Sequence, residues 1–154
     1  MFESCCSPYE SAHLLRTRYG LPVEVFADRP YLTTGRTVET VNLPAELGRR
    51  VRLALSDRSA TPVIADPREL RWLFLVAPPT PYHPVPNPLL RRLLAYGASV
   101  PQPGSRIMLP REDGPEGWHW ACEPEPGPLS LPHRVVVLTA VRQAILQGAD
   151  HISA

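Results

Sequence analysis

Hydrophobic and polar positions along the chain switch several times between a helical and an extended pattern. Apolar residues recurring every three to four positions predict helices over residues 8–18, 44–56, 87–94 and 131–147. Runs of β-branched and aromatic residues between turn residues predict strands over 21–26, 30–34, 36–43, 61–65, 70–77, 98–100, 106–109 and 118–122. This order predicts an α+β fold, a single-domain sandwich over residues 1–154 with a largely antiparallel sheet and about four helices.

Capping and turn residues support these boundaries. Ser7 with Glu10 three residues later has the pattern of a capping box, and Gly20 is placed to end the helix that Ser7 begins. Pro44 suits the first position of the second helix, and Asn87 is expected to cap the third.

The extended segments suggest how the sheet is built. The unbroken apolar run from Trp72 to Val76 predicts a strand that is buried on both faces and lies at the centre of a sheet. We expect it to form a hairpin with residues 61–65. Segments 21–43 and 98–122 are each expected to form a small antiparallel meander.

Composition indicates one folded domain and limits its partners. Of the 154 residues, 44% are hydrophobic and 20% are charged, as in ordinary globular proteins. The formal charge of +1 provides no global attraction to nucleic acid or anionic membranes, so an anion site must be a local patch. We find neither a secretory signal nor an apolar run near the roughly 20 residues of a membrane span, and we expect a cytoplasmic protein without a membrane partner.

The motifs of the common enzyme classes are missing from the sequence. Gly-x-Ser-x-Gly, Gly-x-Gly-x-x-Gly and Walker-type loops do not occur, nor does an Asp-x-Asp or Asp-x-Glu triplet. The closely spaced acids Glu112 with Asp113 and Glu123 with Glu125 are predicted in loops, where we expect them to be solvated. The histidines lack the spacing that places two metal ligands on one helical face. We therefore expect no catalytic residue, no metal and no other cofactor.

The adjacent residues Cys5 and Cys6 leave one enzymatic alternative. They precede a predicted helix N-terminus, where the helix dipole stabilises a thiolate, so a Cys-dependent enzyme is one hypothesis for the function. Because they lie near the chain start with no histidine base fixed beside them, we expect residues 1–6 to be flexible and both thiols to be dispensable.

Arginines provide the candidate binding site. All 16 basic residues are arginine, and Arg71, Arg106 and Arg111 are predicted at strand ends or in an adjacent turn. His119 stands between two tryptophans on a predicted strand, so its side chain is expected on the face opposite theirs. If the arginines converge, they form a phosphate site beside rings that can stack a base. Arginines covering apolar neighbours at strand ends explain the pattern equally well.

A resemblance to a known family appears between Thr61 and Glu123. This stretch contains a Pro-Val strand, the strand Arg-Trp-Leu-Phe-Leu-Val, and the run Arg106-Ile-Met-Leu-Pro-Arg-Glu-Asp-Gly-Pro-Glu-Gly-Trp-His-Trp. It resembles the later part of the N-terminal domain of bifunctional DNA primase/polymerases and small stand-alone actinobacterial relatives.

The departures from that family bear on activity. Its metal-binding acid pair has no counterpart upstream of Thr61, and Leu70-Arg71-Trp72 replaces the histidine expected before the aromatic strand. The resemblance therefore implies a non-catalytic, primase/polymerase-like domain with an accessory or regulatory role that binds nucleotide or nucleic acid through Arg71, Arg106, Arg111 and His119. The competing hypothesis is a protein-interaction module whose proline-rich loop, Pro78 to Pro88, docks to a partner.

Overall fold

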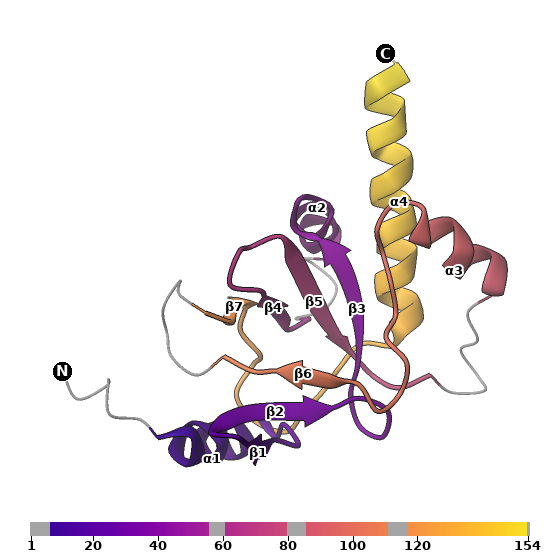
Figure 1. The fold of residues 1–154 in the computed structure, drawn as a ribbon. Coiled ribbons are helices and arrows are strands. Elements are labelled where there is room, and N and C mark those ends of the chain that lie inside the picture. Colours follow the sequence, from indigo (N-terminus) through magenta and orange to yellow (C-terminus); the bar gives the residue numbers. More distant parts are fainter. Residues whose placement is uncertain (1–6, 56–60, 80–85, 111–116, 154) are drawn as a thin grey trace.

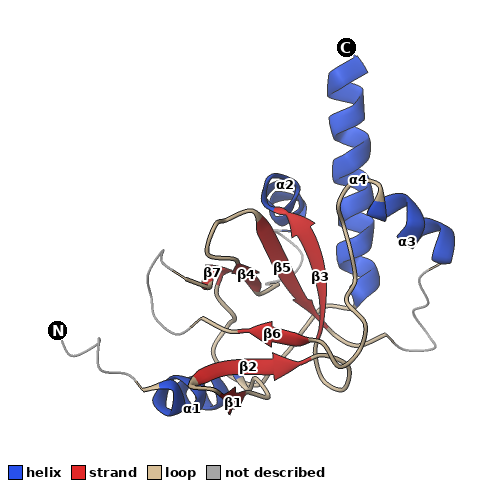
Figure 2. Cartoon of the chain, viewed as in Figure 1, coloured by secondary structure: helices blue, strands red, loops and turns tan. Residues whose placement is uncertain are grey.

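The fold is given by a computed structural model that describes residues 7–55, 61–79, 86–110 and 117–153. Within these ranges the chain forms four helices and two antiparallel sheets, one of three strands and one of four (Figures 1 and 2). The expected α+β fold is confirmed.

Helices and short strands alternate along the chain. In order, the elements are α1 (Pro8–Tyr19), β1 (Glu24–Phe26), β2 (Arg29–Thr33), β3 (Glu39–Pro44), α2 (Ala45–Leu55), β4 (Val63–Ala65), β5 (Arg71–Val76), α3 (Asn87–Leu94), β6 (Arg106–Met108), β7 (His119–Cys122) and α4 (Arg134–Ser153).

The four-stranded sheet has the order β3-β5-β4-β7, so β5 is an interior strand as its apolar run predicted. The expected hairpin of β4 and β5 is also confirmed, with Ile64 opposite Leu73. Asp66 stabilises the turn of this hairpin, because its Oδ1 accepts hydrogen bonds from the backbone N–H groups of Leu70 and Arg71 at 2.7 and 3.1 Å.

The three-stranded sheet has the order β1-β2-β6 and corrects the two predicted meanders. The first meander loses its third strand, because β3 pairs with β5 in the other sheet. The second divides between the sheets, since β6 pairs with β2 and β7 pairs with β4. Turn residues specify hairpins between neighbouring strands but not pairings between distant ones, which depend on the faces that can be buried together.

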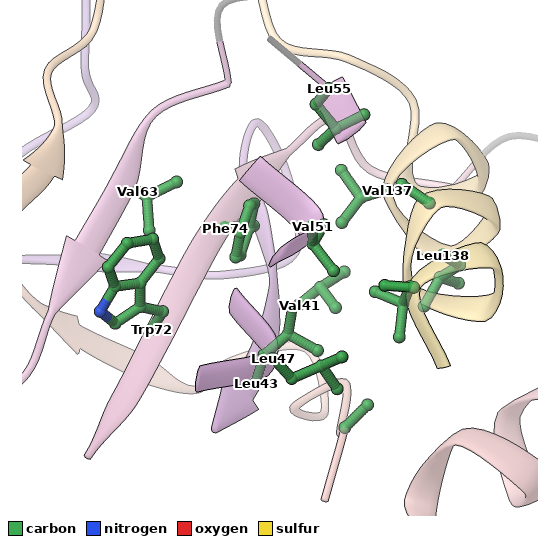
Figure 3. Close-up of a cluster of buried hydrophobic side chains, with 14 of the residues drawn as sticks. Val41, Leu43, Leu47, Val51, Leu55, Val63, Trp72, Phe74, Val137 and Leu138 are labelled. Atoms are coloured by element: carbon green, nitrogen blue, oxygen red, sulfur yellow. The ribbon is translucent and has the colours of Figure 1, made fainter. Parts of the chain in front are cut away.

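Two hydrophobic clusters lie on opposite faces of the four-stranded sheet. The first is packed under α2 and α4 and includes Val41, Val51 and Phe74 (Figure 3). The second lies between the two sheets and α1 and includes Leu32 and Ile107. Strand β5 supplies both clusters, because Trp72, Phe74 and Val76 belong to the first and Leu73 and Leu75 to the second. This double burial explains its unbroken apolar sequence.

The helix ends agree with the sequence at α1 and differ elsewhere. Ser7 Oγ accepts from Glu10 N–H at 3.1 Å, completing the expected capping box, and Gly20 ends α1 with φ of 70°. Pro44, however, is the last residue of β3, where it pairs with Arg71. Asn87 lies inside α3, because the extended Pro86 occupies the capping position without a side-chain hydrogen bond. Helix α4 begins and ends later than expected and extends past both sheets (Figure 1).

Candidate functional site

Four exposed side chains and one buried aromatic ring gather on the outer face of the three-stranded sheet. Successive strand residues point to opposite faces. Leu32 and Ile107 point inward to the second cluster, as does the partly buried Val25. The alternate positions therefore lie on the outer face, and they include Glu24, Phe26, Arg29, Tyr31 and Arg106. We call these five residues the Phe26–Arg106 platform.

A tight hairpin positions the two ends of β1 and β2. Phe26 lies opposite Arg29 across a two-residue turn of Ala27 and Asp28, whose φ angles are 51° and 60°. Two left-handed residues match the twist of the flanking strands, and glycine or asparagine usually fills such positions. The hairpin keeps Phe26 on the surface, where the residue is 59% exposed.

Arg106 connects the platform across the sheet. It pairs with Thr33 on β2, and its side chain reaches over the neighbouring Tyr31. Its Cζ atom lies 5.0 Å from the ring centroid of Tyr31 and 4.9 Å from that of Phe26. Both distances are within the range of cation–π attraction. The guanidinium is therefore held against two rings, one of which is widely exposed.

Glu24 and Tyr31 form the acidic side of the platform. The Tyr31 hydroxyl donates to Glu24 Oε2 at 2.7 Å. This hydrogen bond, then burial, then the negative charge of Glu24 raise the pKa of Tyr31, while the Arg106 charge opposes the shift. The shift favours the protonated phenol, whose hydrogen bond fixes the orientation of the Glu24 carboxylate.

The arginines singled out in the sequence have different surroundings. Arg106 belongs to the platform, whereas Arg71 is an exposed residue at the start of β5, opposite Pro44 in the other sheet. The structure thus places these two on different sheets with different neighbours. Arg111 lies outside the described residues.

His119 is engaged by its own neighbours. One ring nitrogen, Nδ1, lies 2.9 Å from the carbonyl oxygen of Gly117, and the other, Nε2, lies 3.1 Å from Glu69 Oε1. The His119 side chain is 15% exposed. On β7, His119 pairs with Ala65, whose side chain belongs to the first cluster. Trp118 and Trp120 pack on the second cluster, on the other face of the sheet. The His119 side chain therefore points away from both tryptophans, as expected.

A second polar feature lies inside the protein at Glu39. The residue is 2% exposed, and its Oε2 has no hydrogen-bond partner, nor does the buried Nε of Arg134. Burial raises the pKa of Glu39, and the charge of Arg134 partly offsets the shift. Among the described residues no group of three or more histidines, cysteines and acids could hold a metal ion, so Glu39 is not part of a metal site there.

Other sequence candidates fall partly or wholly outside the described ranges. Cys5 and Cys6 lie outside them, as do residues 80–85 of the loop from Pro78 to Pro88. In the parts of the chain that the structure covers, no helix is long and apolar enough to cross a membrane.

Sequence reasoning found Arg106 but missed its partners. Glu24 and Arg29 each stand two positions before an aromatic residue, but Val25 and Phe26 are both apolar, so the sequence does not show which face is exposed. The pairing of β2 with β6, which brings Arg106 to these residues, is not visible there. Comparison with known protein families, curated proteins and solved structures gives no match for this chain.

Proposed function

We propose that this protein is a non-catalytic module that binds single-stranded nucleic acid on the Phe26–Arg106 platform. The observation that supports the proposal most directly is the guanidinium of Arg106, held 4.9 Å from a phenylalanine ring that is itself 59% exposed. Proteins that bind single strands combine aromatic faces, on which bases stack, with cations that follow the phosphate backbone.

The residues around Phe26 fit such a ligand. Arg29 is exposed and lies opposite Phe26 on the same face, so it is placed to contact the phosphate of a nucleotide stacked on that ring. A sheet face with an exposed aromatic ring suits splayed, unstacked bases. In a duplex the faces of the bases are covered by neighbouring bases and cannot stack on Phe26, so the platform favours a single strand.

The biological role that we propose is accessory or regulatory. The resemblance to the primase/polymerase domain supports a role close to nucleic acid, and Arg106 lies within the stretch that carries it. Because the acid pair of that family has no counterpart upstream of Thr61, the proposal includes binding and no synthesis.

The test is fluorescence anisotropy with labelled single-stranded DNA and RNA of about 12 nucleotides. A stacked base contributes about 1–3 kcal/mol, so Phe26→Ala should weaken binding about tenfold. Tyr9→Ala is the matched control, because Tyr9 is a 67% exposed aromatic residue on α1, and it should bind like the wild type. Arg29→Ala should reduce the slope of log affinity against log salt by about 0.7.

Two results would contradict this proposal. Equal binding by Phe26→Ala and the wild type would place the nucleic acid elsewhere on the protein. No binding of the wild type to single-stranded DNA or RNA would reject nucleic-acid binding altogether.

The alternative function, protein interaction, is favoured by exposed apolar residues at the C-terminal end of α3, the helix that follows the proline-rich loop. Leu94 at the end of α3 is 59% exposed and Tyr96 is 52% exposed. A partner docking there should be lost in a Leu94→Ser, Tyr96→Ser variant that binds nucleic acid normally. Unchanged partner binding by this double variant would reject the alternative.

A further inference from the structure

We infer that the platform selects guanine, and that Glu24 reads the edge of the base that stacks on Phe26. This inference rests on the proposed function, because it specifies which base occupies the same surface. It starts from an unusual feature, which is an acidic side chain in a surface that would otherwise attract a polyanion.

The position of Glu24 allows it to contact a stacked base. Glu24 and Phe26 are both exposed and two residues apart on the same face of β1. Residues with this spacing have Cα atoms about 7 Å apart. A base stacked on the Phe26 ring therefore brings one of its edges within reach of the Glu24 side chain.

Tyr31 positions the carboxylate without saturating it. The Tyr31 hydroxyl donates to Glu24 Oε2 at 2.7 Å. A carboxylate accepts through two oxygens with about four lone-pair sites, so acceptor capacity remains for a ligand. Because the Arg106 guanidinium packs on the Tyr31 ring, the orientation of this hydroxyl is itself constrained. Tyr31 is thus a positioning residue for Glu24.

The chemistry of the carboxylate discriminates among the bases. Guanine presents two adjacent donors, N1–H and the 2-amino group, on its Watson–Crick edge, and these match the two oxygens of a carboxylate. Adenine and cytosine place an acceptor nitrogen beside the amino group, and uracil and thymine flank one donor with two carbonyl oxygens. These acceptors repel the carboxylate, which can only accept when ionised.

The negative charge of Glu24 also favours guanine over the other bases. A carboxylate beside a phosphate backbone weakens binding unless it gains hydrogen bonds from the ligand. A guanine edge supplies two such bonds and offsets the repulsion. Arg29 and Arg106 supply the complementary charges for the phosphates on the same face.

The experiment compares oligonucleotides of about eight residues that differ at one central base within an otherwise uniform uridine or thymidine strand. Wild-type protein should bind the guanine strand about tenfold more tightly than those with adenine, cytosine or uracil, in RNA and in DNA. Inosine retains N1–H but lacks the 2-amino group, so it should bind with intermediate affinity.

Two variants test the role of Glu24. Glu24→Gln should lose the preference for guanine and bind the other bases more tightly, because the repulsive charge is removed. Glu46→Gln is the matched control, since Glu46 is an exposed acid in the first turn of α2, and it should keep the full preference.

The outcomes separate this inference from the function on which it rests. Similar wild-type affinity for all bases would overturn guanine selection and leave single-strand binding intact, whereas no binding to any strand would overturn both. A guanine preference that survives in folded Glu24→Gln would assign the reading to another residue and overturn the role of Glu24. If that variant fails to fold, the wild-type series with inosine still decides whether two donors are read.

Discussion

At the scale of single residues, Tyr31 shows how a buried ring can organise an exposed surface. Its ring is covered by Arg106, its hydroxyl is bound to Glu24, and it belongs to neither of the two core clusters. The folded state favours the protonated phenol, because its hydrogen bond to Glu24, its burial and the adjacent negative charge raise the pKa of Tyr31 above 10.0. This arrangement makes the stability of the fold sensitive to alkaline pH.

The sign of this effect follows from proton linkage. The folded protein binds the Tyr31 proton more tightly than the unfolded chain, so the contribution is complete below pH 10.0 and is lost as pH rises through the raised pKa. We expect the free energy of unfolding to fall less steeply between about pH 9 and 11 in Tyr31→Phe than in the wild type. Urea unfolding measures the difference, and Tyr9→Phe, at an exposed site, should follow the wild type. Equal slopes in wild type and Tyr31→Phe would refute this role.

At the scale of elements, the packing of α2 on the four-stranded sheet depends on a glycine. Gly48 is buried in α2, and a Cβ atom added there would lie 3.0 Å from both Cβ and Cε3 of Trp72. The Trp72 side chain belongs to the first cluster and is 6% exposed, so it has little room to move. The close contact between helix and sheet therefore leaves no free space for a larger residue at position 48.

We expect Gly48→Ala to destabilise the protein by about 1–3 kcal/mol, because overpacking outweighs the roughly 1 kcal/mol that alanine gains over glycine in a helix. Gly148→Ala in α4 is the matched control. Its added Cβ would meet the end of the Arg50 side chain, which can move aside at the loss of one hydrogen bond, from Nη2 to the carbonyl oxygen of Ala144. Thermal denaturation should show a lowered Tm for Gly48→Ala and a smaller change for Gly148→Ala, where alanine's higher helix propensity offsets the lost hydrogen bond. A stabilised Gly48→Ala would contradict the proposed contact with Trp72.

At the scale of the whole molecule, the features predictable from sequence are those encoded within a few residues. The capping box of Ser7 and Glu10, the β4–β5 hairpin and the interior position of β5 were all confirmed. The partners of β3, β6 and β7 were not, because strands far apart in sequence pair according to the surfaces that they bury together. Leu32 and Ile107, for example, meet because β2 pairs with β6, which brings both side chains into the second cluster.

The candidate site was predictable to a similar extent. Arg106 was singled out because arginines at strand ends can bind phosphate, but Phe26 and Tyr31 join it only through the pairing of β2 with β6. Arg71 was grouped with Arg106 from the sequence, and the structure assigns it to the other sheet. A binding surface built from three strands is therefore visible only once their order is known.

The most direct test of the account is a map of the residues that respond to single-stranded nucleic acid in solution. In two-dimensional NMR spectra of the full chain, titration with a short guanine-containing strand should shift the amide signals of β1, β2 and β6, with the largest changes near Phe26, Tyr31 and Arg106. The signals of α2, on the far side of the four-stranded sheet, should stay unchanged (Figure 1). Shifts confined to α2 or α3, or no shifts at all, would contradict the assignment of nucleic-acid binding to the Phe26–Arg106 platform.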